Sequence, residues 1–174
     1  TGAGGRLCDS MARQPLGPRT SSVFPVPSRA AVYARDYADA CVIAAATSDP
    51  SRRISKQTFQ IVPKIREVDA LMTPALQTRV VECHPEFIFC RLNGNRPLQQ
   101  PKKETRDRRG GPTQRCALLI AAGYPAELLQ RRLFKRADAS DDDMIDAFAC
   151  AAAAADIVRG RATRVPSTPD VDSK

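Results

Sequence analysis

Apolar residues recur with the period of an α-helix over most of this chain, and polar residues mark where the expected helices begin. One helix is predicted to begin at Ser28, a favourable N-cap residue, and to end before Ser48. Its apolar stripe contains Val32, Tyr33, Tyr37, Cys41 and Ala44. A short helix is also expected in the segment CDSMAR near the start of the chain.

Four further helices follow from the same pattern. Ser55 is placed to cap a helix over SKQTFQIVPKIREVDALM, in which Pro63 should cause a kink or a break. Short helices are predicted over residues 115–122 and after Pro125. The longest helix, DDDMIDAFACAAAAADIVRG, should follow Ser140 as its N-cap, and its small residues would allow close packing against a sheet.

One strand is predicted, over residues 78–83, because TRVVEC has the best β-branched run of the chain. Alternate residues of a strand point to opposite faces, so Glu82 and His84 would share one face. Glu86 would join them if the strand continued past Pro85. Since one strand does not make a sheet, its partners are expected in weaker segments or upstream of the first residue.

Composition narrows the class of protein. A length of 174 residues is consistent with one domain, and a hydrophobic content of 43% is enough for a core. Aromatic residues make up only 5% and Trp is absent, so the core should be aliphatic and rich in alanine. The sequence has no apolar run of about 18 residues and no secretion signal, which predicts a cytoplasmic protein without a membrane partner. Its six cysteines form no CxxC pair, so we expect buried, reduced thiols rather than a zinc ribbon.

The charge of the chain points to a phosphate-bearing partner. The net charge is +8 and the pI about 9.5, which predicts binding to nucleic acid, either DNA or RNA. A basic surface without a partner is the alternative. Residues 95–114 form a long basic loop in which Lys102 and Lys103 are candidate phosphate contacts, and Arg115 directly after it is a further candidate. The alternative here is a loop that is merely solvated.

Three carboxylates are candidates for a metal site. Glu82 lies among apolar residues, where an acid is costly to bury without a partner or a metal. Asp143 and Asp146 are three residues apart, so both should project from the same side of the last helix. Carboxylates from a strand and a packed helix suit Mg²⁺ or Mn²⁺ ions in phosphoryl transfer. The alternatives are a solvated Glu82 on an edge strand and acids that only cap the helix after Ser140.

Six blocks of the sequence carry a family resemblance. They are, in order, GRLCDSMAR, LGPRTSSVFPVPSR, ISKQTFQIVPKIREVD, VVECHPEFIFCRLNG, KK and DDDMIDAFACAAAAA. This set resembles the predicted RNase H-like nuclease family, a domain of unknown function numbered 429, from about Gly5 to about Arg164. The blocks SKQ…PKIREVD and E-x-HPE-x-x-F are the specific ones. The resemblance implies an RNase H-like α/β domain over residues 1–164 and a flexible tail over residues 165–174.

The resemblance also implies roles for individual residues. Glu82, Asp143 and Asp146 correspond to the metal ligands of the RNase H-like superfamily, with Mg²⁺ or Mn²⁺ as the cofactor. His84 and Glu86 stand in the family's HPE position, which makes them candidate site residues. Lys103 stands in the KK position and is a candidate for the same reason.

One departure from the family pattern changes the expected fold and activity. The family begins with a strand carrying G-V-D-G and has further strands before the GRxCD block, whereas this chain begins just before GRLCD. The first-strand aspartate has no counterpart, and Asp9 in the CD block is not a substitute. We therefore expect a helix-dominated α/β domain with an incomplete sheet, because the N-terminal strands are absent. The expected function is a metal-dependent nuclease with little or no activity in this chain. The alternative is a non-catalytic protein that binds nucleic acid or a protein partner through its basic loops.

Overall fold

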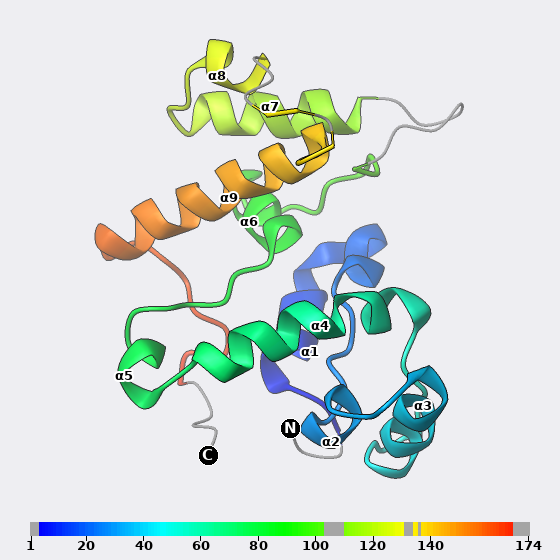
Figure 1. Ribbon diagram of the computed structural model, residues 1–174. Helices are drawn as coiled ribbons and strands as arrows, with labels where there is room; N and C mark the ends of the chain where they lie inside the picture. Colours follow the sequence, from blue (N-terminus) through cyan, green and yellow to red (C-terminus); the bar gives the residue numbers. More distant parts are fainter. Residues whose placement is uncertain (1–3, 103–109, 131–133, 136, 169–174) are drawn as a thin grey trace. The chain divides into compact units, whose positions relative to one another are not determined.

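The computed structural model describes residues 4–102, 110–130, 134–135 and 137–168, and within these ranges every regular element is a helix (Figure 1). The elements are α1 (Leu7–Arg13), the 3-10 helix η1 (Gln14–Ser22), α2 (Arg29–Val32), α3 (Tyr37–Ala46), α4 (Lys56–Leu71), α5 (Pro74–Gln77), α6 (Pro85–Leu92), α7 (Gly111–Ala121), α8 (Ala126–Gln130) and α9 (Asp141–Val158). The chain divides into two compact units. Unit 1 contains Thr1–Met11, Phe24–Glu82 and Thr168–Lys174, and unit 2 contains Ala12–Val23 and Cys83–Ser167. An RNase H-like domain over residues 1–164 stays a prediction.

In unit 1, the single helix predicted from Ser28 is two helices. Ser28 does cap α2, since its hydroxyl oxygen accepts the backbone N–H of Ala31 at 3.4 Å. The helix then ends, and a new one begins where the Asp36 carboxylate accepts the backbone N–H of Asp39 at 2.9 Å. The prediction of one continuous helix was therefore wrong, because a second capping residue inside the apolar stripe starts α3 anew.

The helix α4 holds unit 1 together. Ser55 caps it as predicted, and Pro63 lies inside a helix that continues to Leu71, so the expected break does not occur. From α4 the Arg66 side chain donates to the backbone carbonyls of Val32 and Ala34, both at 2.7 Å. These bonds satisfy carbonyls at the end of α2 and fix it against α4. The core of unit 1 consists of Ala31, Val32, Ala34, Ala40, Ala44, Ile54 and Val62.

The predicted strand over residues 78–83 is not formed. These residues make a turn and an extended segment, and the side chains of Val80 and Val81 remain exposed. A β-branched run becomes a strand only when a neighbouring strand pairs with it, and the described part of the chain offers none. Pro85, which suits the first turn of a helix, starts α6 instead. Glu82, His84 and Glu86 therefore do not share a strand face.

Unit 2 is built around α6, which packs against η1, α7 and α9 (Figure 1). The side chains of Phe89 and Cys90 on α6 are fully buried. The small residues of α9 do allow close packing, with Ala149 fully buried, but against α6 and α7 rather than against a sheet. The same helix thus carries the packed alanine face and, at its start, the predicted acids.

The structure bears on the cysteines and on the helices of the chain. All six cysteines are free thiols, but only Cys90 is buried; the other five are partly exposed, so the expectation of buried thiols was wrong for them. Among the described residues, no helix has both the length and the apolar character needed to cross a membrane.

Candidate functional site

The first turn of α9 fixes one of the predicted acids. Ser140 is the N-cap of α9, and its hydroxyl oxygen accepts the backbone N–H of Asp143 at 3.2 Å. In return, the Asp143 Oδ2 atom accepts the Ser140 backbone N–H at 3.0 Å and the Ser140 hydroxyl at 2.6 Å. This reciprocal capping box satisfies helix-terminal donors and puts an acid where the helix dipole favours it. The capping role offered by the sequence as an alternative is confirmed for Asp143.

One turn further along α9, Asp146 contacts a lysine of the basic loop. Lys102 Nζ donates to Asp146 Oδ2 at 2.6 Å, and 30% of each side chain is exposed. The structure thus brings together two predicted site residues that are 44 positions apart. A pair this exposed contributes roughly 0–1 kcal/mol, so a competing ion can displace the lysine at small cost. Lys103 lies outside the described residues.

The third acid of unit 2, Glu86, is buried in an ion pair. Arg115 Nη2 donates to both carboxylate oxygens of Glu86 at 2.8 Å, and the two side chains are 0% and 8% exposed for Arg115 and Glu86. The guanidinium also donates to the Gly111 carbonyl at 3.1 Å and lies 5.5 Å from the centre of the Phe89 ring. Arg115 was expected to be a phosphate contact of the basic loop. That is wrong, because α7 begins four residues earlier than predicted and turns this side chain into the core.

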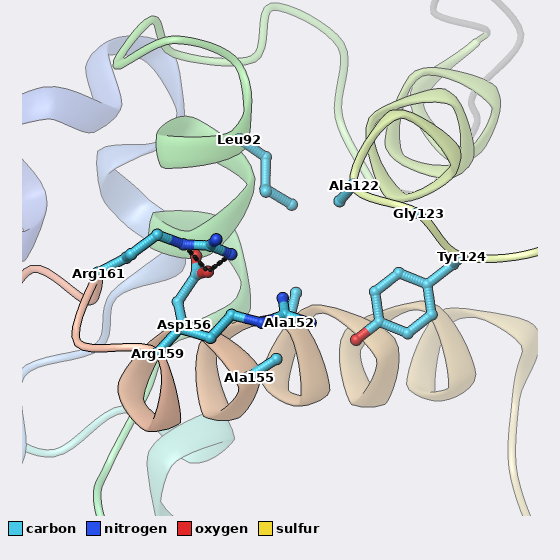
Figure 2. Close-up of a pocket in the computed structure, with 9 residues that line it drawn as sticks. All are labelled: Leu92, Ala122, Gly123, Tyr124, Ala152, Ala155, Asp156, Arg159 and Arg161. Atoms are coloured by element: carbon cyan, nitrogen blue, oxygen red, sulfur yellow. Dashed lines mark hydrogen bonds and ion pairs between the residues drawn. The ribbon is translucent and has the colours of Figure 1, made fainter.

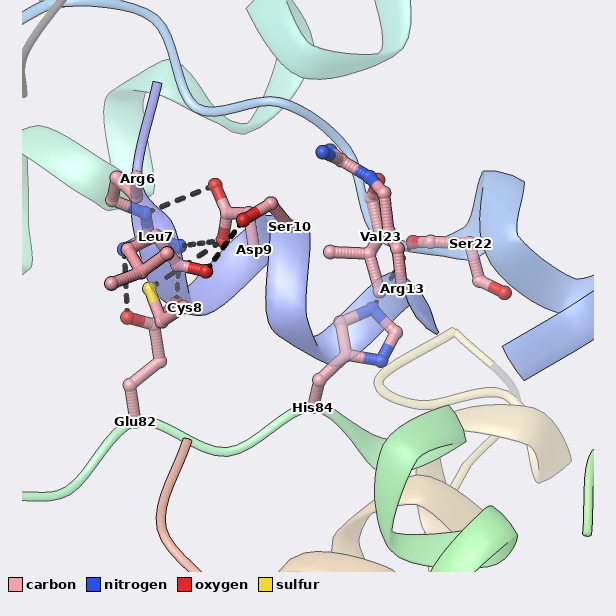
Figure 3. A network of polar contacts seen from close by, with 10 residues as sticks. All are labelled: Arg6, Leu7, Cys8, Asp9, Ser10, Arg13, Ser22, Val23, Glu82 and His84. Carbon is pink, nitrogen blue, oxygen red and sulfur yellow. Dashed lines mark hydrogen bonds and ion pairs between the residues drawn. The ribbon is translucent and has the colours of Figure 1, made fainter. Parts of the chain in front are cut away.

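His84, the only histidine, faces η1. Its ring nitrogen Nε2 lies 3.1 Å from the Ser22 carbonyl oxygen, which accepts a hydrogen bond when Nε2 carries the proton. The other nitrogen, Nδ1, is buried and has no hydrogen-bond partner among the described residues. Close by, Arg13 donates to the Val23 carbonyl at 3.0 and 2.8 Å, as seen in Figure 3. His84 therefore holds the end of η1 against the start of α6.

In unit 1, Glu82 shares an arginine with a second acid (Figure 3). Arg6 donates to the two carboxylate oxygens of Glu82 at 2.7 and 2.9 Å and to those of Asp9 at 3.1 and 2.6 Å. Burial of Arg6 lowers the pKa of its guanidinium, but the hydrogen bonds from Asp9 and Glu82 outweigh burial and raise the pKa above its ordinary value. The side chain of Glu82 is 70% exposed and that of Asp9 only 8%. Arg6 is thus a permanent cation between two carboxylates.

The sequence interpretation missed this arginine and its second acid. It set Asp9 aside because the CD block follows the position expected for a first-strand aspartate. The available signal was the GRLCD block itself, in which Arg6 and Asp9 are three residues apart and can meet on one helical turn. Their meeting with Glu82, 76 positions from Arg6, has no local signal.

The metal-site prediction is not tested by these contacts. Among the residues that the structure describes, no group of three or more His, Cys, Asp or Glu could hold a metal ion. Asp143 and Asp146 lie in unit 2 and Glu82 in unit 1, so the approach of Glu82 to the pair stays a prediction.

Comparison with known proteins settles the family. The family described as "Protein of unknown function (DUF429)" matches residues 1–171. The chain belongs to this family. No curated protein and no solved structure matches this DUF429 member. The family assignment covers the GRLCD, HPE and α9 segments alike, so the contacts of Arg6, Glu86 and Asp146 all lie within the matched region.

Proposed function

We propose that this DUF429 family member is a metal-dependent nuclease of the RNase H-like type, which hydrolyses phosphodiesters at the start of α9. The observation that carries the proposal is the contact of Lys102 with Asp146. In this contact a partly exposed carboxylate meets a partly exposed cation of the basic loop, one turn beyond Asp143. A phosphodiester and a divalent ion require this combination of groups.

The donor set is chemically suited to Mg²⁺ or Mn²⁺. Asp143 and Asp146 project from one side of α9 and offer hard carboxylate oxygens, and Mg²⁺ is often held by one or two carboxylates together with waters and substrate phosphates. The resemblance to RNase H-like proteins adds Glu82 as a proposed third ligand. A bound divalent ion supplies Lewis-acid stabilisation of the charge that develops on the phosphate.

The residues of the chain have separate parts in this proposal. Asp146 would hold the ion once its contact with Lys102 is broken, and the Lys102 ammonium would then be available to a phosphate oxygen of the substrate. Ser140 keeps Asp143 in a fixed rotamer at the first turn of α9 through the capping box. Little rearrangement is needed, because the exposed ion pair is weak.

The test combines Mn²⁺ titration calorimetry with cleavage assays on single-stranded, duplex and branched DNA and RNA. Asp146→Asn should weaken Mn²⁺ binding at least roughly tenfold and abolish any cleavage that the unmodified chain shows, since it removes a charged ligand. Asp138→Asn, an equal charge change at an exposed turn, should affect neither. Identical Mn²⁺ affinities for the two variants would refute the site.

Lys102→Ala separates the two roles further. It removes the cation that competes for Asp146, so Mn²⁺ affinity should stay level or rise, while cleavage should fall because a phosphate contact is lost. Lys135→Ala, at an exposed position, is the matched control. Loss of both ion binding and cleavage in Lys102→Ala would contradict the displacement step.

Non-catalytic binding of nucleic acid is a second candidate, favoured by a specific observation. Each of Glu82, Glu86 and Asp146 already has an arginine or lysine partner, which compensates the charge of each acid without a metal ion. The affinity for nucleic acid should then fall steeply as the salt concentration rises. Replacing Lys102, Lys103, Arg108 and Arg109 with Ala should make this dependence on salt less steep. An unchanged slope, together with an absence of cleavage, would reject this candidate as well.

A further inference from the structure

Unit 2 contains a cavity that plays no part in the proposed hydrolysis. Its volume is about 370 Å³, within the roughly 300–1,000 Å³ usual for small-molecule sites. It lies where α6 and α7 end beside the last turns of α9, and its lining includes Leu92, Tyr124 and Ala155 (Figure 2). Arg159, which directly follows α9, is thirteen positions beyond Asp146, or about 20 Å along a helix. Ala152, the lining residue of α9 nearest to the acids in the sequence, is six positions beyond Asp146.

The polar side of the cavity has an excess positive charge. Arg161 donates to Asp156 Oδ1 at 2.8 and 3.2 Å, so these two charges compensate each other. Arg159 also lines the cavity and forms no ion pair within the described ranges of the chain. In Figure 2 the Arg159 side chain runs along α9 with its guanidinium directed toward Ala152. The cavity therefore offers one uncompensated guanidinium to an anionic group.

The opposite side of the cavity is apolar and aromatic. Leu92 and Tyr124 lie on two sides of the space above α9, and Ala155 forms part of its floor (Figure 2). The Tyr124 ring is held by an edge-to-face contact with Phe148, with ring centres 5.4 Å apart and planes at 71°. A ring fixed in this way is a ready surface for a flat heterocycle, and small alanine side chains leave room for it.

We propose that this cavity binds a nucleoside monophosphate, with the phosphate at Arg159 and the base against Tyr124 and Leu92. This group of phosphate, sugar and base occurs both in a free mononucleotide and at the phosphorylated end of a nucleic-acid strand. Binding here does not depend on hydrolysis near Asp146, because neither Asp143 nor Asp146 lines the cavity.

The experiment measures dissociation constants of the whole chain for AMP, adenosine and inorganic phosphate by titration calorimetry. Arg159→Gln should weaken AMP binding roughly tenfold and leave adenosine unchanged, since only the phosphate contact is lost. Arg164→Gln removes the same charge outside the cavity and should bind AMP like the unmodified chain. If Arg159 interacts only with the helix dipole at the C-terminal end of α9, Arg159→Gln would lower the free energy of unfolding without changing AMP affinity. That result would overturn the proposal.

A second pair of variants tests the apolar side. Ala155→Leu keeps a strong helix former but fills the cavity, so it should abolish binding of both AMP and adenosine. Ala154→Leu, the same change at the neighbouring exposed position, should have no effect. Equal AMP affinity in the two variants, or no AMP binding at millimolar concentration by the unmodified chain, would refute the site. A short 5′-phosphorylated oligonucleotide that binds more tightly than AMP, and is blocked by Ala155→Leu, would assign the site to a strand end; preference for AMP would assign it to a free nucleotide.

Discussion

The buried pair of Glu86 and Arg115 gives the sharpest test of the structure of unit 2. Glu86→Gln keeps the size of the side chain and one carbonyl acceptor but removes its charge. The guanidinium of Arg115, which is 0% exposed, would then be left with neutral partners only. These are the new amide, the carbonyls of Gly111 at 3.1 Å and Gln100 at 3.5 Å, and the Phe89 ring. An uncompensated buried charge is among the most destabilising single changes known for a folded protein.

The expected magnitude follows from burial and geometry. Removing one partner of a buried ion pair costs about 3–5 kcal/mol, and the acceptor kept by Gln places this variant near about 3 kcal/mol. A double variant, Glu86→Leu with Arg115→Met, removes both charges and fills similar volume with apolar atoms. It should therefore recover most of the loss, since the desolvation cost disappears together with the attraction.

Hydrogen exchange followed by mass spectrometry is the appropriate assay, because it reads α6 and α7 separately from unit 1. A loss of about 3 kcal/mol corresponds to a roughly 100-fold faster exchange of protected amides in these two helices. Glu127→Gln on α8 changes the same charge at an exposed position and is the control. A loss below about 1 kcal/mol in Glu86→Gln, or a double variant as unstable as the sum of both single variants, would refute the buried pair.

Three further changes test other parts of the fold. Ser140→Ala removes half of the capping box and should lower the free energy of unfolding by about 1 kcal/mol in urea denaturation. Gly111→Ala should cost about 1–3 kcal/mol in the same assay, because its Cβ would lie 1.8 Å from the Pro101 carbonyl oxygen and the backbone must move. Burial raises the pKa of the Cys90 thiol above its ordinary value of 9.0, so the unfolded chain loses this proton at a lower pH than the folded chain. The contribution of Cys90 to stability is thus complete below pH 9 and is lost as the pH rises through the folded-state pKa; Cys90→Ala should make unfolding less sensitive to alkaline pH.

Matched variants control each of these measurements. Ser167→Ala changes an exposed serine, Gly4→Ala adds a Cβ where no atom lies within 4 Å, and Cys150→Ala removes a partly exposed thiol. A loss in Ser140→Ala no greater than in Ser167→Ala would contradict the capping role. If Gly111→Ala proved as stable as Gly4→Ala, the Pro101 carbonyl would not lie against α7. If the free energy of unfolding fell equally steeply with alkaline pH in Cys90→Ala and Cys150→Ala, burial of Cys90 would not be the cause of the pH dependence.

Local chemistry explains which elements the sequence predicted. Ser28, Ser55 and Ser140 each cap a helix as expected, because an N-cap bonds a backbone N–H only three residues away. The strand over residues 78–83 failed because pairing partners, not the β-branched residues themselves, decide whether a strand forms. Pro63 was expected to kink or break α4, and the helix is not broken there, because packing of α4 against its unit outweighs one lost hydrogen bond.

The candidate site was less predictable, for a different reason. Its acids could be named from residue type and family blocks, but their partners lie far away in the sequence. The separations are 76 positions for Arg6 and Glu82, 44 for Lys102 and Asp146, and 29 for Glu86 and Arg115. Such contacts depend on how helices pack, which no local pattern encodes.

Exposure decides which of these acids is available for chemistry. Glu86 is 8% exposed and its arginine is 0% exposed, so separating them would leave a buried charge at a cost of about 3–5 kcal/mol. Asp146 and its lysine are each 30% exposed, and Glu82 is 70% exposed, so exchange of their partners for a metal ion or a phosphate costs roughly 1 kcal/mol or less. Glu86 is therefore expected to stabilise the fold by fixing α7 against α6. Asp146 and Glu82, in contrast, can exchange their lysine and arginine partners for other ions. Mn²⁺ affinity should accordingly respond to Asp146→Asn but not to Glu86→Gln measured under conditions where that variant remains folded.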